Sequence, residues 1–101
     1  NPRLLMSMLA ILSRRLRTVV ELLFDLSFRE VTSRLAKYIS ARRSKRFRLP
    51  VSKKTLSAEL GTIPETLSRS FSALEKEGAI TIDGSEIVVI NERQLEKLSN
   101  L

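Results

Sequence analysis

The sequence contains no cysteine, no histidine and no tryptophan, and the first two absences remove whole classes of function. Without cysteine there is no disulfide, no thiolate metal ligand and no thiol nucleophile. Without histidine the chain lacks the commonest general base and metal ligand. Because no paired acidic constellation or phosphate-cradling glycine loop is present either, the sequence does not support an enzyme. We expect no catalytic residue, metal site or cofactor within these residues, and a cytoplasmic protein.

Positive charge is abundant and unevenly placed in the 101 residues, which carry a formal net charge of +7 and are 43% apolar. Residues 1–50 hold twelve Lys and Arg against three Asp and Glu, a balance of +9, whereas residues 51–101 hold six against eight. The densest basic run is ARRSKRFR, residues 41–48. Such a run is typical either of a solvated loop or of a surface that contacts a polyanion. The length and apolar content predict one small domain plus an appendage.

Residues 3–26 have the apolar spacing of one long helix. Six apolar residues occupy the a and d positions of a heptad repeat, with Arg15 at the remaining d position: Leu5, Met8, Leu12, Val19, Leu22 and Leu26. A helix this apolar needs partners in water, and we expect it to form a homodimer; packing in a monomeric core is the alternative. The Arg residues after the first apolar run argue against a secretion signal, and that run is too short to span a membrane.

The heptad is interrupted at residues 26–29, where we expect the first helix to end and a second to begin near Glu30. Pro50 cannot continue a helix, so residues 47–50 are expected to form an edge strand or an extended link. A third helix begins after the N-cap residue Ser52 and ends at Gly61, and a fourth spans residues 63–77. Two short helices joined by a tight glycine-containing turn indicate a helix-turn-helix.

After Gly78 the pattern changes to the alternation of strands. Residues 79–82 and 86–90 flank an Asp-Gly-Ser turn and predict a β-hairpin, which is the position of a wing after a helix-turn-helix. Residues 91–101 predict a last short helix that packs through Leu95 and Leu98. The expected fold is therefore mainly α with a small β wing: a dimerisation helix over residues 1–27, then a winged helix-turn-helix over residues 28–101.

The fourth helix has a buried face and an exposed face of unusual chemistry. Leu67, Phe71 and Leu74 recur at helical spacing and define the buried face. The opposite side is a contiguous row that we call the polar strip: Glu65, Ser68, Arg69, Ser72 and Lys76. In a DNA major groove, Arg donates to guanine, Glu accepts from cytosine and Ser bonds either way. The strip therefore predicts readout of DNA bases by Glu65, Ser68 and Arg69.

Two local explanations of the same residues are open. Thr62 and Glu65 have the spacing of a capping box, and Glu65 and Arg69 have the spacing of an i,i+4 ion pair. At the front of the third helix, Ser52, Lys53 and Lys54 are expected to contact phosphates, although an ordinary solvated helix start has the same composition. The full set predicted to contact the DNA backbone is Ser52, Lys53, Lys54, Thr66, Ser72, Lys76 and Ser85.

The order of these parts resembles the C-terminal half of the CRP/FNR family of bacterial transcription regulators. The most specific segment is LGTIPETLSRSFSALEKEGAI, and the segments EVTSRLAKYI, SKKTLSAELG and DGSEIVVI support it. The resemblance implies a homodimer on double-stranded DNA, contact with RNA polymerase, and an N-terminal sensor domain, expected upstream of Asn1, that would bind the effector. It also implies that Phe28, Arg29 and Glu30 form the hinge between the dimerisation helix and the DNA-binding domain.

Within the family, Glu-x-x-Ser-Arg on the recognition helix resembles the fumarate–nitrate regulator branch. That resemblance implies a TTGAT-like half-site, with Arg69 on guanine, Glu65 on the opposing cytosine and Ser68 near a thymine. The sequence departs from the family at Ile63, where Ser or Thr commonly caps the helix and contacts a phosphate, so Thr62 is the expected cap. A rival interpretation is a protein-interaction module, in which the apolar helix and the winged helix bind protein. A basic amphipathic helix on a membrane surface, residues 3–17, is a weaker rival.

Overall fold

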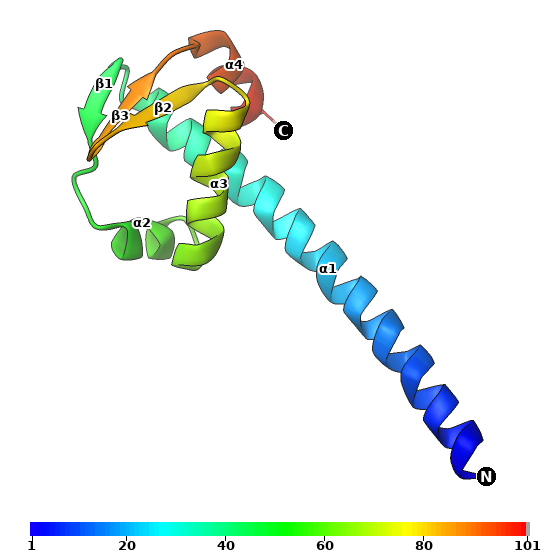
Figure 1. The fold of residues 1–101 in the computed structure, drawn as a ribbon. Coiled ribbons are helices and arrows are strands. Elements are labelled where there is room, and N and C mark those ends of the chain that lie inside the picture. Colours follow the sequence, from blue (N-terminus) through cyan, green and yellow to red (C-terminus); the bar gives the residue numbers. More distant parts are fainter. Residues whose placement is uncertain (101) are drawn as a thin grey trace.

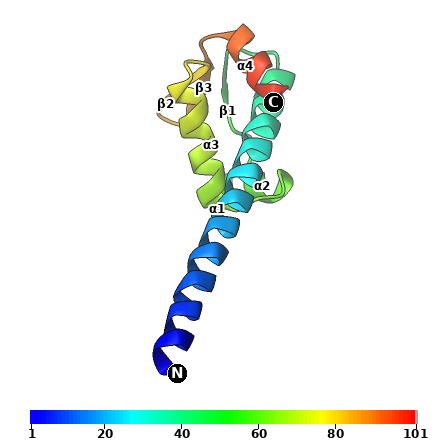
Figure 2. The ribbon, with the colours of Figure 1, turned by 90° about the vertical axis from the view of Figure 1, so that its right-hand side faces the viewer.

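Helix α1 runs without a break from Pro2 to Ala41 and is the longest element of the computed structural model, which describes residues 1–100. Forty residues of α-helix rise about 60 Å, which accounts for most of the 65 Å long axis of the molecule. Asn1 caps the helix, because its Oδ1 accepts a hydrogen bond of 3.0 Å from the backbone N–H of Arg3. The N-terminal half of α1 projects from a compact head that contains every other element (Figures 1 and 2).

The continuity of α1 corrects the expectation that the helix ends near residues 26–29. That segment breaks the heptad, but it contains no glycine or proline to break the backbone. The hydroxyl of Thr32 lies 2.8 Å from the carbonyl oxygen of Phe28, one turn earlier in the same helix. The pattern of apolar side chains therefore changes at this point, while the helical backbone continues.

The head is built from six further elements. They are β1 (Arg46–Arg48), α2 (Lys53–Glu59), α3 (Pro64–Lys76), β2 (Ile80–Asp83), β3 (Glu86–Val89) and α4 (Glu92–Ser99). The strands form one antiparallel sheet in the order β1-β3-β2. These elements confirm the predicted mainly-α fold with a small β wing, and the expected edge strand lies slightly earlier than residues 47–50, as β1.

The core of the head lies where α1, α2, α3, α4 and the sheet meet. Its buried apolar residues are Leu35, Ala36, Ile39, Leu56, Leu67, Phe71, Leu74, Ala79, Ile80, Ile87 and Leu95. Buried hydroxyls join the helices: Thr32 Oγ1 of α1 lies 2.9 Å from Ser70 Oγ of α3, and Ser33 Oγ donates to the carbonyl of Ser99 at the end of α4 over 2.7 Å. The C-terminal part of α1 is thus a structural member of the head.

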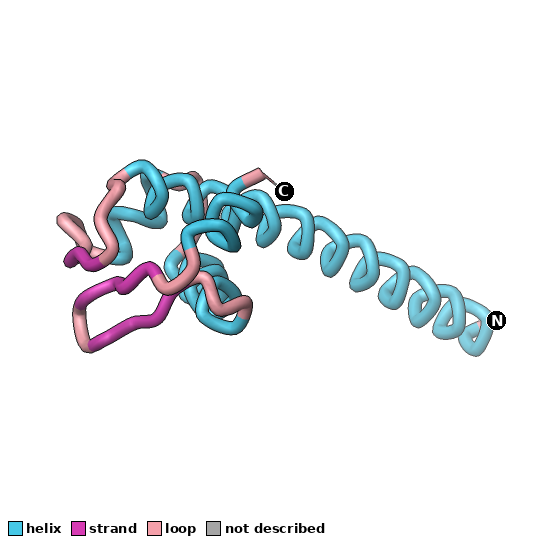
Figure 3. Tube along the Cα trace, turned by 90° about the horizontal axis from the view of Figure 1, so that it is seen from above, coloured by secondary structure: helices cyan, strands magenta, loops and turns pink. Residues whose placement is uncertain are grey.

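Strands β2 and β3 form the predicted hairpin, joined by a two-residue turn of Gly84 and Ser85. Gly84 has φ +62°, which favours glycine in this turn, although a Cβ there would meet no neighbouring atom. Seen from above, the hairpin projects to one side of the helices (Figure 3). None of the helices within residues 1–100 has a stretch both long and apolar enough to cross a membrane.

Candidate nucleic-acid interface

The turn between α2 and α3 is tight and is fastened to α1. Gly61 has φ +72°, and the backbone N–H of Thr62 donates to the carbonyl of Ser57 over 2.8 Å. Arg34 of α1 donates through Nη1 to the carbonyl of Leu60 over 2.9 Å. The positive φ favours glycine at this position, and a Cβ there would lie 3.3 Å from that same Nη1, so any other residue would also push the Arg34 guanidinium slightly aside. Helix α1 therefore holds the helix-turn-helix at its turn.

Helix α2 begins as the sequence predicts. Ser52 is its N-cap, and the Oγ accepts a hydrogen bond of 3.1 Å from the N–H of Thr55. Lys54 is exposed, and Lys53 is exposed with its Nζ 5.6 Å from the ring centroid of Phe71. The front of α2 therefore presents two cations at the end of a helix whose first N–H groups point outward.

The N-cap of helix α3 lies one residue after Thr62, the expected cap. Its N-cap is Ile63, which makes no side-chain hydrogen bond to the helix start, and Pro64 is the first helical residue. Thr62 therefore does not cap the helix, which corrects the expectation placed on it. The capping box is not formed either, because an isoleucine side chain has no acceptor to offer at the N-cap.

The residues of the polar strip are all exposed on α3. No ion pair joins Glu65 to Arg69 among the described residues 1–100, although the two are one turn apart. Glu65 in the first turn and Lys76 in the last turn complement the helix dipole. That effect accounts for the two ends of the strip, but it does not account for the two short hydroxyls and one Arg between them. These middle residues remain available to a ligand.

Arg69 has one neighbour that the sequence did not indicate. Its guanidinium carbon lies 5.3 Å from the ring centroid of Phe24, which belongs to the projecting half of α1. This separation is within the range of a cation–π contact. The central cation of the polar strip is therefore held beside the long helix in this structure.

Two hydroxyl residues of α3 are buried, and one of them, Thr66, is a predicted contact of the DNA backbone. Thr66 is only 4% exposed, so its hydroxyl does not offer a surface contact, whereas its N–H lies in the first turn of the helix. Ser70, one of three closely spaced serines, is fully buried and meets Thr32. Its small side chain serves the packing of α3 on α1. Helical spacing could not predict that Thr32 is the partner of Ser70. It could have predicted that Ser70 is buried, because Ser70 lies on the same side of α3 as Leu67.

The basic run at residues 41–48 is partly engaged within the protein. The guanidinium of Arg42 lies 5.2 Å from the ring centroids of both Tyr38 and Phe47. Arg46 pairs with Asp83 and Glu86 of the hairpin. Its hydrogen bonds to these carboxylates raise the pKa of Arg46 above its ordinary value, and the bond to Glu86 has the larger effect. The run is thus neither a plain solvated loop nor a row of free cations.

Ser85, the predicted backbone contact at the hairpin turn, is exposed.

The residues predicted for dimerisation and for the hinge all lie on α1. Every predicted dimerisation residue is at least half exposed in the chain by itself: Leu5, Met8, Leu12, Val19, Leu22 and Leu26. Of the predicted hinge residues, Phe28 is half-buried, while Arg29 and Glu30 are exposed. Glu30 accepts a hydrogen bond of 2.6 Å from Arg34, the residue that also holds the turn before α3.

Helices α2 and α3, the glycine turn between them, the hairpin that follows and the supporting segment of α1 define a winged helix-turn-helix. Residues 33–98 match the family model described as the Crp-like helix-turn-helix domain. This match covers more than half of the chain, and the chain therefore belongs to the CRP/FNR family. The resemblance inferred from the sequence is confirmed.

Individual relatives agree with this assignment. The chain is 30% identical over 99 residues to the transcriptional activator protein FnrA of Stutzerimonas stutzeri, covering 89% of this chain and 41% of that protein. The crystal structure of DNR from Pseudomonas aeruginosa is similar with a TM-score of 0.76 and 33% identity, covering 97% of this chain and 46% of that one. For the catabolite activator protein of Thermus thermophilus the TM-score is 0.71 and the identity 31%, covering 92% and 45%. The chain thus spans less than half the length of these three proteins.

Proposed function

We propose that this chain is the dimerisation and DNA-binding part of a transcription regulator that binds a near-palindromic operator as a homodimer. The observation that carries the proposal is the exposed polar strip of α3, for which neither a capping box nor an ion pair within residues 1–100 provides a partner. The work of the molecule is then selective binding rather than catalysis. Its site of action would be the cytoplasm, on the chromosome and beside RNA polymerase.

Base readout falls to Glu65, Ser68 and Arg69 in this proposal. An arginine donates to both O6 and N7 of guanine, and a carboxylate accepts from N4 of the cytosine on the other strand. A carboxylate is repelled by the phosphate backbone, so Glu65 contributes favourably only where a base supplies a donor. The resemblance of these three residues to the fumarate–nitrate regulator branch implies a TTGAT-like half-site. Each good base contact discriminates by roughly 1–3 kcal/mol.

Phosphate contacts supply affinity and register rather than sequence choice. In this role we place the exposed side chains of α2, α3 and the hairpin turn: Ser52, Lys53, Lys54, Ser72, Lys76 and Ser85. Thr66 contributes through its backbone N–H, since its side chain is buried.

The dimer is proposed to form along the exposed apolar seam of α1 that ends at Leu26. The next two heptad positions are Arg29 and Ser33, and Ser33 is already occupied by α4 of the same chain. A partner helix therefore has an apolar seam to pair with only as far as Leu26. This supports a boundary between the dimerisation part, residues 1–27, and the DNA-binding part, residues 28–101. Two recognition helices would then enter major grooves about 34 Å apart.

The test is a fluorescence-anisotropy titration of this chain against a TTGAT-N4-ATCAA duplex, a TGTGA palindrome and a scrambled duplex, each at two salt concentrations. We expect a preference for the first duplex that survives the higher salt, because base contacts depend on salt less than phosphate contacts do. Equal binding to all three duplexes that disappears with salt would contradict base readout, and no binding to DNA would favour the protein-interaction alternative.

Two variants separate readout from simple charge. Arg69→Ala should remove sequence preference by more than it weakens binding to the scrambled duplex. Lys76→Ala, on the same helix, is the matched control, and it should weaken binding to all duplexes alike and lower the slope of log K against log salt by about 0.9. If the two variants behave identically, Arg69 is only a phosphate contact.

A further inference from the structure

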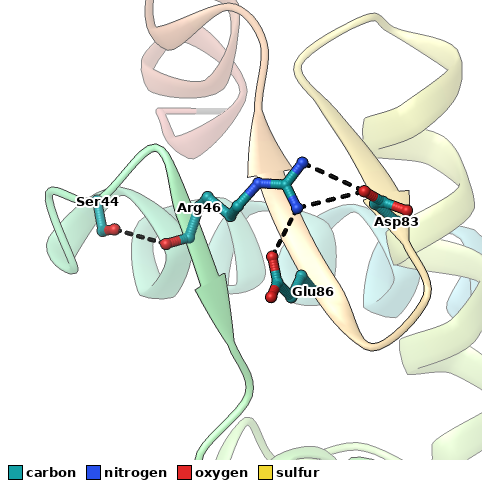
Figure 4. A network of polar contacts seen from close by, with 4 residues as sticks. All are labelled: Ser44, Arg46, Asp83 and Glu86. Atoms are coloured by element: carbon teal, nitrogen blue, oxygen red, sulfur yellow. Dashed lines mark hydrogen bonds and ion pairs between the residues drawn. The ribbon is translucent and has the colours of Figure 1, made fainter.

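The hairpin turn carries two carboxylates that are both held by one arginine from the neighbouring strand (Figure 4). Arg46 of β1 contacts Asp83 Oδ2 through Nη1 and Nη2, each over 3.2 Å, and Glu86 Oε2 through Nη1 over 2.7 Å. Asp83 and Glu86 are cross-strand partners at the turn end of the hairpin. A guanidinium suits this arrangement, because its planar fork of donors reaches two acceptors at once.

This arrangement resolves an electrostatic conflict in a wing. Asp83 and Glu86 flank Gly84 and Ser85, the turn that would approach a phosphate backbone. Two unpaired carboxylates at that place would repel DNA, since the duplex carries one negative charge per roughly 1.7 Å of its axis. Hydrogen-bonding both carboxylates to a cation lowers that repulsion and also fixes the edge of the hairpin against β1.

We propose that Arg46 is a positioning residue for the wing, which binds no base or phosphate itself but holds Asp83 and Glu86 and offsets one of their two negative charges, so that the turn at Ser85 can approach DNA. The inference rests on the proposed function and adds to it a residue outside the helix-turn-helix. It also gives part of the basic run at residues 41–48 a specific role, because one of its cations acts on the protein's own carboxylates.

Arg48 provides a matched control within the same strand. It lies two residues beyond Arg46, on the same face of β1, and is exposed. It is directly opposite Glu86 in the ladder, but among residues 1–100 it forms no ion pair with that carboxylate. If only the total charge near the wing mattered, removing Arg48 or Arg46 would have equal effects on DNA binding.

The experiment is a mutant cycle on the full 101-residue chain, with the TTGAT-N4-ATCAA duplex as the probe and anisotropy as the readout. The variants are Arg46→Ala, Arg48→Ala, the double variant Asp83→Asn with Glu86→Gln, and the triple variant that adds Arg46→Ala. Arg46→Gln repeats the first variant with the side-chain stem retained, in case the alanine form does not fold. Circular dichroism checks the fold of each protein.

Arg46→Ala should weaken binding at least about four-fold at low salt, because the wing then carries two uncompensated negative charges instead of one, and one unit charge placed about 5 Å from a phosphate opposes binding by about four-fold in water. Arg48→Ala should weaken binding by only about two- to three-fold, the effect of one distant exposed charge. The triple variant should bind within about three-fold of the parent chain and keep its salt dependence. Replacing the two acids should therefore strengthen binding more in the absence of Arg46 than in its presence, because Arg46 otherwise holds both carboxylates by hydrogen bonds.

Three results would overturn the proposal. Equal gains from neutralising the acids with and without Arg46 would reduce the effect to total charge. A triple variant that stays weak, with a salt slope lower by about 0.9, would make Arg46 a direct phosphate contact. Unchanged binding by Arg46→Ala, with lowered thermal stability, would make the pairing purely structural. If the parent chain itself shows no DNA binding, it is the proposed function that fails, and this is seen before any variant is compared.

Discussion

Replacing Phe24 by alanine should strengthen binding to the TTGAT-N4-ATCAA duplex. The guanidinium of Arg69 lies 5.3 Å from the Phe24 ring, and that ring is 40% exposed. We expect the guanidinium to leave this ring when it enters the major groove and donates to guanine. Sequence-specific binding must therefore break the contact. The free energy of the contact then opposes DNA binding and lowers the affinity.

The size of the effect follows from the exposure of the pair. A cation–π contact at an exposed site is worth about 0.5–1 kcal/mol, and this corresponds to roughly a two- to five-fold change in affinity. Phe24→Ala should tighten binding by that factor, and Phe24→Leu should do nearly the same, because it removes the ring but keeps an apolar side chain. The gain should disappear in the Arg69→Ala background, where there is no guanidinium to release.

Met6→Ala is the matched control for this prediction. Met6 lies on the same side of a straight α1 as Phe24, five helical turns nearer the N-terminus, and is 67% exposed. Because it is about 27 Å from Phe24 along the helix and so out of reach of Arg69, its replacement should leave DNA affinity unchanged. Weaker binding by Phe24→Ala would refute the reasoning, since it would mean that the ring orients Arg69 for the groove. A gain that persists without Arg69 would also refute it.

Three stability predictions follow from local geometry, each measured by urea unfolding followed at 222 nm at one fixed protein concentration. Ile63→Ser should stabilise the chain by about 1 kcal/mol by giving α3 the side-chain cap it lacks, and Ile63→Ala, which supplies no acceptor, should not. Arg43→Gly should stabilise it by roughly 0.5–1 kcal/mol, because Arg43 has φ +51° after the end of α1; a loss of stability there would instead show a packing role for its side chain. Thr32→Val should cost about 1–3 kcal/mol by leaving the buried Ser70 hydroxyl unpaired, and adding Ser70→Ala should recover part of that loss; strictly additive losses would contradict the pairing.

Most of the head could be predicted from the sequence because its signals are local. Ser52, Gly61 and Gly78 mark helix ends by the chemistry of caps and of positive φ, and each is found in that role or conformation. The apolar spacing of Leu67, Phe71 and Leu74 indicated the buried face of α3, and all three are at most 2% exposed. These features depend on a few neighbouring residues and on helical geometry, which the sequence states directly.

Contacts between distant segments could not be predicted in the same way. The pairing of Arg46 with Asp83 and Glu86 depends on the order and register of the strands. Two contacts, from Arg34 to the Leu60 carbonyl and from Phe24 to Arg69, depend on how α1 passes the turn and helix α3. The spacing of exposed cations in the sequence does not indicate which distant residues they contact. The charge composition therefore predicted a basic surface, but not which of its Lys and Arg residues pair with groups of the protein itself.

The expectation that α1 ends near residue 27 was wrong about the backbone, yet the sequence change that prompted it is real. Up to Leu26 the heptad seam is apolar and exposed. At Ser33 the same seam donates a hydrogen bond to the end of α4, and Ala36 is fully buried in the head. One face of one helix therefore passes from a surface open to a second chain to a surface covered by its own domain. A boundary of this kind is defined by what covers the side chains, and an unbroken helix can contain it.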